Sequence, residues 1–240
     1  MRVIGIDLAA QPRKTAACVL DGLDATIALG CDDEGLIALA DGAEKVAIDA
    51  PFGWPRPFVE ALVAHRSHEA WPAPDDGTPD EYRRALSYRE TDRAVMRIRR
   101  PLSVSTDKLG VTAMRCAHLL QRWSLQETVD RSGVTGRFVE VYPAAAMTCW
   151  NITPGPYKGT NGAKAREAVL RDLLDRVPVV VDTTVVLASD DALDALVAAL
   201  VARAVVLGLA DGPPDDRRDL AVEEGWIHLP HVGSLSRMSE

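Results

Sequence analysis

The sequence begins with an apolar segment that carries an acid near its end: Arg2-Val3-Ile4-Gly5-Ile6-Asp7-Leu8-Ala9. Short apolar runs bounded by turn residues predict β-strands. Two more runs follow closely, from Thr15 to Leu20 and from Ala25 to Leu29. The connections between the three runs are too short to hold helices, so we expect three strands joined as antiparallel hairpins.

The rest of the chain predicts a mixed α/β fold. A short helix over 33–39 precedes a fourth apolar run, 45–50, and a strand–helix–strand succession favours parallel pairing of that fourth strand. Residues 138–142 predict a fifth strand, and helices are expected over 82–100, 111–122, 163–176 and from Ser189 onward, with a loop over 71–79 and a short terminal strand within 225–230. We therefore predict one domain over 1–240, with a mixed five-stranded sheet flanked by helices and an α-helical insertion after the fourth strand, about residues 52–130.

Composition excludes several classes of protein. The chain has 240 residues, 47% of them hydrophobic, and a formal charge of -8. A disordered, collagen-like or coiled-coil chain has a different composition, and the acidic balance argues against a generic nucleic-acid binder. The four cysteines are scattered and predict reduced core thiols. We expect a cytoplasmic protein with no membrane segment; the sequence does not indicate an oligomeric state.

Acids interrupt three of the predicted strands. Asp7 ends the first apolar run, Asp49 ends the fourth, and Glu140 lies within the fifth. The C-terminal ends of strands in α/β sheets face the functional crevice, and an ionised carboxylate there is costly to desolvate without a partner. For a single such acid, a turn or cap role is the better interpretation. Several acids on neighbouring strands instead favour a cation site.

The long helix contributes further acids at its start, in Ser189-Asp190-Asp191-Ala192-Leu193-Asp194. Capping by Ser189 and a favourable interaction with the helix dipole explain acids in the first turn, but Asp194 lies beyond that turn. We predict that Asp7, Asp49, Asp191 and Asp194 bind Mg²⁺ or Mn²⁺ through hard oxygen ligands, with Glu140 as a supporting ligand or base.

The order of these elements resembles the RNase H-like fold, and the spacing of the acids resembles its Holliday-junction-resolvase branch. A closer resemblance is to an uncharacterised bacterial and archaeal family of predicted nucleases, catalogued as domain of unknown function 429. It rests on 5–9 (GIDLA), 48–51 (IDAP), 89–93 (RETDR), 140–143 (EVYP), 157–158 (YK), 191–195 (DALDA) and 224–227 (EGWI). The resemblance implies an RNase H-like fold and a nuclease activity. It also implies that Arg89, Thr91, Asp92 and Arg93 belong to a site motif.

Positive charge is concentrated next to that motif. Residues 83–115 contain nine cations and three acids, a net charge of +6, so the remainder of the chain carries -14. Arg89, Arg93, Arg97 and Arg100 recur at helical spacing, so one helix face can meet phosphates. A solvated helix face and a buried Arg–Asp pair are the competing interpretations. In a later loop, Lys158 can contact a phosphate, although a plain surface loop is an equally physical interpretation.

These features predict a metal-dependent nuclease or phosphodiesterase. Arg89, Thr91, Arg93 and Lys158 are the expected substrate-binding residues, and nucleic acid is the expected partner. Two alternatives remain. The first is an ATP-using phosphotransferase of actin-like type, which shares the first-strand acid; the second is a binding module without catalysis that uses the arginine segment to hold nucleic acid or protein.

Overall fold

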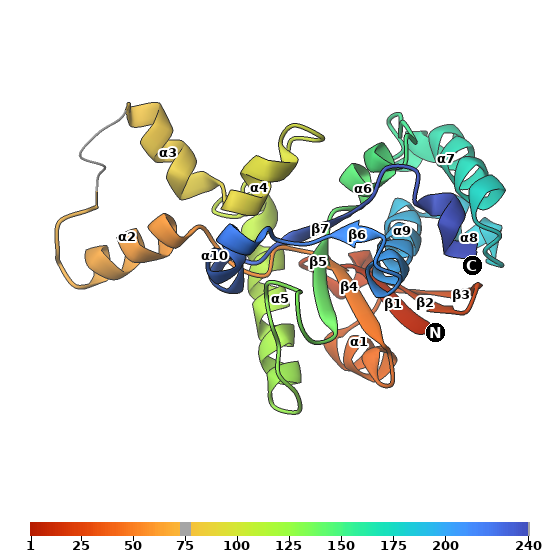
Figure 1. Ribbon diagram of the computed structural model, residues 1–240, viewed down its shortest axis with the longest axis horizontal. Helices are drawn as coiled ribbons and strands as arrows, with labels where there is room; N and C mark the ends of the chain where they lie inside the picture. Colours follow the sequence, from red (N-terminus) through yellow and green to blue (C-terminus); the bar gives the residue numbers. More distant parts are fainter. Residues whose placement is uncertain (73–77, 240) are drawn as a thin grey trace.

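A computed structural model of the protein describes residues 1–72 and 78–239, and its strands form one seven-stranded sheet (Figure 1). The strands are β1 (Arg2–Asp7), β2 (Ala16–Asp21), β3 (Asp24–Leu29), β4 (Lys45–Asp49), β5 (Phe138–Val141), β6 (Ala210–Asp211) and β7 (Ile227–Pro230). Their order across the sheet is β3-β2-β1-β4-β5-β7-β6. β1, β2 and β3 pair antiparallel, while β1, β4, β5 and β7 run parallel.

Fourteen helical segments surround this sheet in the described part of the chain. The α-helices are α1 (Asp33–Ala40), α2 (Arg56–Arg66), α3 (Pro79–Ser87), α4 (Glu90–Val95), α5 (Asp107–Ser124), α6 (Pro143–Cys149), α7 (Ala163–Arg176), α8 (Thr183–Ala188), α9 (Asp190–Val206) and α10 (Arg218–Glu224). The 3₁₀ turns are η1 (Pro12–Lys14), η2 (Thr160–Gly162), η3 (Asp215–Arg217) and η4 (Leu235–Ser239).

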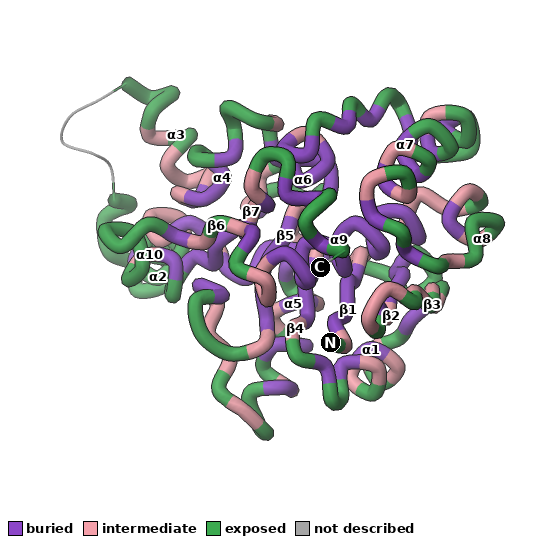
Figure 2. Tube along the Cα trace, turned by 45° about the vertical axis from the view of Figure 1, so that its right-hand side comes forward, coloured by how far each residue is buried: buried purple, intermediate pink, exposed green. Residues whose placement is uncertain are grey.

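The two faces of the sheet are buried by different helices, as side-chain alternation along strands requires. Val3 of β1 and Ala47 of β4 pack in a core dominated by α9. Ile4 and Ile48, one residue further along each strand, pack instead against α1 and α5. The buried stretches of Figure 2 accordingly run through the central strands and α9, whereas α2 and α3 are largely exposed.

The expected hairpins, the parallel fourth strand and the long helix capped by Ser189 are all present. The short terminal strand expected within 225–230 is present as β7, but the count of five strands was wrong, because β6 and β7 extend the sheet beyond β5 to seven strands. β6 has two residues, too few to leave a periodic signal. The helix expected over 82–100 is two shorter helices, α3 and α4. Part of the loop expected over 71–79, residues 73–77, lies outside the described residues.

The described residues between β4 and β5 form four helices, α2 to α5. The first of these helices project to one side of the sheet in Figure 1. The last helix, α5, buries Cys116, Leu119 and Trp123 in the same core as α1 and therefore forms part of a layer of the sheet. All four cysteines of the chain are buried free thiols, as predicted.

Candidate functional site

Two carboxylates meet at the end of the central strands because the strands are parallel and in register. Asp7 is the last residue of β1 and Asp49 the last of β4, and they occupy paired positions in the ladder. Paired residues of neighbouring strands point to the same face. Gly5 and Ala47 precede them by two residues on that face, which is the face covered by α9. Both acids therefore point toward α9.

Gly5 lets α9 come close enough to complete the group. A Cβ atom at position 5 would lie 2.1 Å from the amide nitrogen of Ala199 and 2.2 Å from the carbonyl oxygen of Ala195. Only glycine permits such an approach between a helix and a strand backbone. The close packing brings Asp194 of α9 over the strand ends, where one carboxylate oxygen from each of Asp7, Asp49 and Asp194 lies within 4.8 Å of the others. We call these three residues the acidic triad.

Asp194 is held by two side chains from the loop before α7. Its carboxylate is 1% exposed, accepts a hydrogen bond from the Tyr157 hydroxyl at 2.9 Å, and pairs with the Lys158 ammonium at 2.8 Å. These partners fix the orientation of the carboxylate and supply one positive charge. Within the described part of the chain, neither Asp7 nor Asp49, whose side chains are partly buried, forms an ion pair with a basic side chain.

The electrostatics of the triad follow from burial and like charge. Burial, followed by repulsion from Asp194 and Asp49, raises the pKa of Asp7 well above its ordinary value. Burial and Asp194 raise the pKa of Asp49 to about 8. Burial also raises the pKa of Asp194, although Lys158 and Tyr157 oppose that rise. Three carboxylates beside one ammonium repel one another when all are ionised, and this repulsion adds to burial in raising their pKa values.

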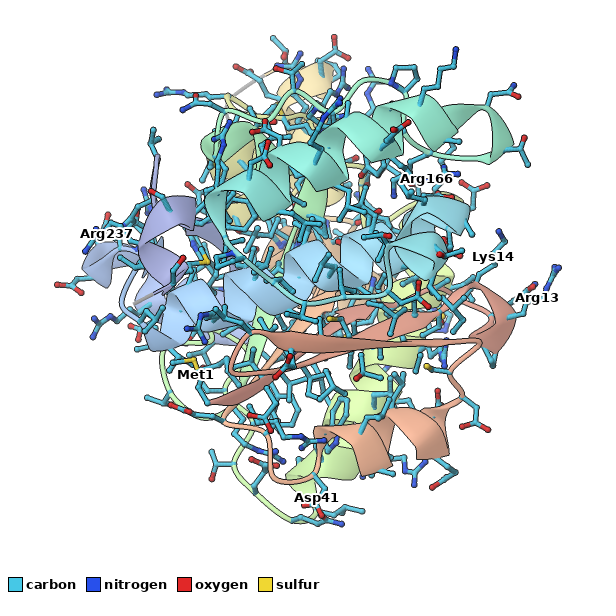
Figure 3. All side chains as sticks on the ribbon, turned by 90° about the vertical axis from the view of Figure 1, so that its right-hand side faces the viewer. Met1, Arg13, Lys14, Asp41, Arg166 and Arg237 are labelled. Carbon is cyan, nitrogen blue, oxygen red and sulfur yellow. The ribbon has the colours of Figure 1, made fainter. Side chains whose placement is uncertain are left out.

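A buried arginine of α7 shapes the loop that carries Tyr157 and Lys158. Arg166, labelled in Figure 3, donates hydrogen bonds to the carbonyl oxygens of Tyr157 at 2.7 Å, Gly159 at 2.8 Å and Leu187 of α8 at 2.9 Å. Gly162 packs directly on this loop, because a Cβ there would lie 2.1 Å from the carbonyl oxygen of Tyr157. Lys158 therefore lies on a backbone that α7 and α8 hold in place.

Asp191 is not brought into the triad. It lies in the first turn of α9 and is partly buried, and it is absent from the group of carboxylates that approach within ligand distance among the described residues. Burial and then Asp190 raise its pKa, while Lys14 and Lys158 lower it. Asp191 faces the same end of the sheet but starts one helical turn before Asp194, which puts it at the edge of the site.

Glu140 is oriented away from the triad. It pairs in register with Ile48, so its side chain emerges on the α5 face of the sheet. There its two oxygens accept hydrogen bonds from Arg89 at 2.6 and 2.8 Å, and one of them also accepts the Phe52 amide at 2.9 Å. Burial raises the pKa of Glu140, and Arg89 opposes that rise. With both oxygens engaged, the structure places Glu140 in an ion network instead of among the triad oxygens.

Arg89 is the centre of that network. Its guanidinium is 2% exposed and also forms a bidentate pair with Asp92, at 2.9 and 3.1 Å, and donates to the Glu224 carbonyl oxygen at 3.0 Å. Thr91 accepts the Ile227 amide at 2.8 Å. The motif over 89–93 therefore joins α4 to β5 and to the segment between α10 and β7. Arg89 and Thr91, expected as substrate-binding residues, make buried structural contacts.

The expected arginine face does not form. α4 ends at Val95, so Arg97 and Arg100 lie beyond the helix that carries Arg93. Arg93 is 46% exposed and pairs with Glu90 at 3.4 Å, while Arg89 is buried. The helical spacing was misleading because the chain leaves the helix after six residues.

A cavity of about 550 Å³ opens above the acidic triad. All three triad residues line it, together with residues that follow β1 and β4, the stretch 99–112 that leads into α5, the end of β5 and the start of α6 (140–144), and residues 155–158. The long connections after β4 and β5 thus enclose the edge of the sheet at which the acids converge. The arrangement is a small enclosed site with carboxylates at its base.

A comparison with family models matches residues 5–219 to the family described as Protein of unknown function (DUF429). The chain belongs to the DUF429 family. A search of the curated proteins and a search of the solved structures each returned no match. The DUF429 match includes all three triad residues and both residues that hold Asp194, and it ends before β7.

Several residues of this DUF429 site were not anticipated from the sequence. Gly5 and Tyr157 stand in the motifs of the family resemblance without a role of their own, and Arg166 falls within the helix expected over 163–176 without a predicted structural role. The nearest signal was the pair Tyr157-Lys158 preceding the helix, which marks a loop but does not reveal that both side chains reach the same carboxylate. That relation depends on α9 packing against β1, a contact between distant parts of the chain.

Proposed function

We propose that this protein is a metal-dependent phosphodiesterase of RNase H-like architecture that hydrolyses nucleic-acid phosphodiester bonds. The single observation that carries the proposal is the acidic triad: three carboxylates from β1, β4 and α9 within 4.8 Å of one another, at the base of a cavity. Hard carboxylate oxygens so placed are the donor set that Mg²⁺ and Mn²⁺ prefer.

Both the charge of these three carboxylates and the type of their donor atoms suit a divalent cation. The triad carries up to three negative charges against one ammonium, and burial with mutual repulsion raises the pKa of Asp7 and of Asp49. A group of carboxylates that repel one another is stabilised by a divalent cation. Asp7, Asp49 and Asp194 would hold the ion, with Asp191 at the edge of the site.

The chain's own residues have separable roles in this proposal. The bound ion supplies Lewis-acid chemistry, which lowers the pKa of a water and stabilises charge on a phosphodiester oxygen. Tyr157 donates to Asp194 and keeps the other carboxylate oxygen directed at Lys158 and the triad. The Lys158 side chain is 60% exposed, so its ammonium can reach a phosphate at the cavity mouth. Arg166 holds the loop that positions both residues.

The architecture supports the same proposal. The antiparallel hairpins, the parallel fourth strand ending in Asp49 and the late helix with Asp194, which carry the resemblance to RNase H-like nucleases, are present in the fold. Within residues 1–72 and 78–239 the strands form one sheet, whereas an actin-like phosphotransferase needs two such units.

The test is a cleavage assay on labelled single-stranded and duplex DNA and RNA, with Mn²⁺, Mg²⁺ or EDTA. We expect cleavage of at least one substrate only with metal. Asp7→Asn should lower its rate at least about 100-fold, since even outer-shell partners of metal ligands contribute about 10- to 100-fold. Asp190→Asn is the matched control, because it removes an acid from the same helix start but outside the triad. Cleavage in EDTA, or full activity of Asp7→Asn, would refute the proposal.

A further inference from the structure

The cavity above the triad has the size of a small-ligand site. Its volume is about 550 Å³, and pockets that bury most of one small organic ligand measure roughly 300–1,000 Å³. A protein that binds the middle of a nucleic-acid duplex instead presents an extended row of basic side chains to the phosphate backbone. The volume of this cavity therefore favours the binding of a single unit of a substrate.

The residues that line the cavity are of two chemical kinds. Besides the carboxylates, the cavity is lined by the apolar residues Leu8, Pro101, Leu102, Leu109 and Pro156, and by Tyr142. Such walls give apolar and aromatic contact to a flat organic group, and nucleobases stack on aromatic side chains with about 1–3 kcal/mol per base. A cavity lined by both carboxylates and apolar residues matches the polar phosphate and the flat base of a nucleotide.

The cations at the cavity are few. Of the described residues that line it, three are basic, and one of these, Arg89, is engaged by Asp92 and Glu140. Arg99 and Lys158 are the other two; the Lys158 ammonium pairs with Asp194, but its side chain is 60% exposed and can also meet a substrate phosphate. Two cations suit one or two phosphate groups and are too few for a long stretch of backbone, because non-specific duplex binding needs many phosphate contacts.

We propose that the cavity accepts the terminal nucleotide of a single strand, with the base against the Leu102 wall and its phosphodiester above the triad. This inference rests on the proposed phosphodiesterase function. In the reaction, water adds its oxygen to phosphorus while the P–O ester bond to the neighbouring nucleotide breaks, and the leaving oxygen takes a proton. The products are a mononucleotide and a strand shortened by one unit.

Binding of the base is tested without turnover. Isothermal calorimetry with Mn²⁺ should show that thymidine 5′-monophosphate binds at least about tenfold more tightly than 2-deoxyribose 5-phosphate, because one apolar contact in a pocket is worth about 10- to 200-fold. Leu102→Asp should remove that preference. Leu102 is 51% exposed, so the substitution does not threaten the core. Leu125→Asp, at an exposed leucine away from the cavity, is the matched control. Equal affinity for the two phosphates would overturn the proposal.

The position of cleavage is tested with two strands of one sequence, one linear and one covalently closed. Release of mononucleotides from the linear strand with the circle left intact is the expected result. Opening of the circle at a similar rate would overturn the terminal-nucleotide inference while upholding the phosphodiesterase. If the protein binds nucleotides with a preference for the base but cuts neither strand, the phosphodiesterase proposal is refuted and the nucleotide-binding cavity is supported.

Discussion

Replacement of Asp49 by asparagine should stabilise the metal-free protein at alkaline pH. The carboxyl group of Asp49 is isosteric with the amide, so the change mainly removes a charge that burial and Asp194 disfavour. In the metal-free protein, the ionised Asp49 carboxylate is therefore destabilised by burial and by repulsion from Asp194. Stability and metal binding should respond to this substitution with opposite signs.

The pKa of Asp49 sets the size and the sign of the effect. A rise of that pKa from its ordinary 3.8 to about 8 means that the folded protein holds the proton more tightly than the unfolded chain between these values. The contribution of Asp49 to stability is consequently largest below about pH 4 and is lost as pH rises toward 8. At about 1.36 kcal/mol per pH unit the full loss is roughly 6 kcal/mol. Solvent access and coupling to two other acids reduce our expectation to about 2–3 kcal/mol.

Thermal unfolding of both proteins in EDTA measures this effect. For a chain of this length about 1 kcal/mol corresponds to roughly 2–4 °C, so Asp49→Asn should melt about 5–10 °C higher than wild type at pH 8 and almost equally at pH 4. Added Mn²⁺ at about 100 times its dissociation constant should stabilise wild type by about 2.7 kcal/mol and leave the variant unchanged.

The control is Asp41→Asn, which changes the net charge equally at an exposed position after α1. It should leave the melting temperature nearly unchanged at every pH. A wild-type protein that melts higher than Asp49→Asn at pH 8 in EDTA would refute the reasoning. So would a difference between the two that does not grow from pH 4 to pH 8.

Three further predictions follow from contacts around the site. Gly5→Ala should destabilise the fold by at least about 1–3 kcal/mol in chemical denaturation, because the new methyl group overlaps the backbone of α9; unchanged stability would contradict the close packing. Arg89→Met should cost about 3–5 kcal/mol by leaving Glu140 buried without its partner, and the double variant with Glu140→Gln should recover part of that loss. Tyr157→Phe should weaken Mn²⁺ binding about tenfold or more in calorimetry by freeing the buried carboxylate of α9, and wild-type affinity would show that the hydroxyl does not position it.

Much of the fold could be predicted because local pattern and topology agree near the N-terminus. Short connections allow only hairpins, and the helix before β4 allows its parallel return. The ends of the sheet were harder. The two-residue β6 carries no period, and the arginines over 89–100 match a helix that the chain leaves at Val95.

The same division applies to the candidate site. The sequence alone determined that Asp7 and Asp49 would share an edge of the sheet, because the C-terminal ends of adjacent parallel strands lie at the same edge. Only the tertiary structure decided which other acids join them. A one-residue difference in strand phase turns Glu140 to the opposite face, and the absence of a side chain at Gly5 lets α9 bring Asp194 down to the triad. Sequence spacing records neither relation, because both depend on how distant segments pack in space.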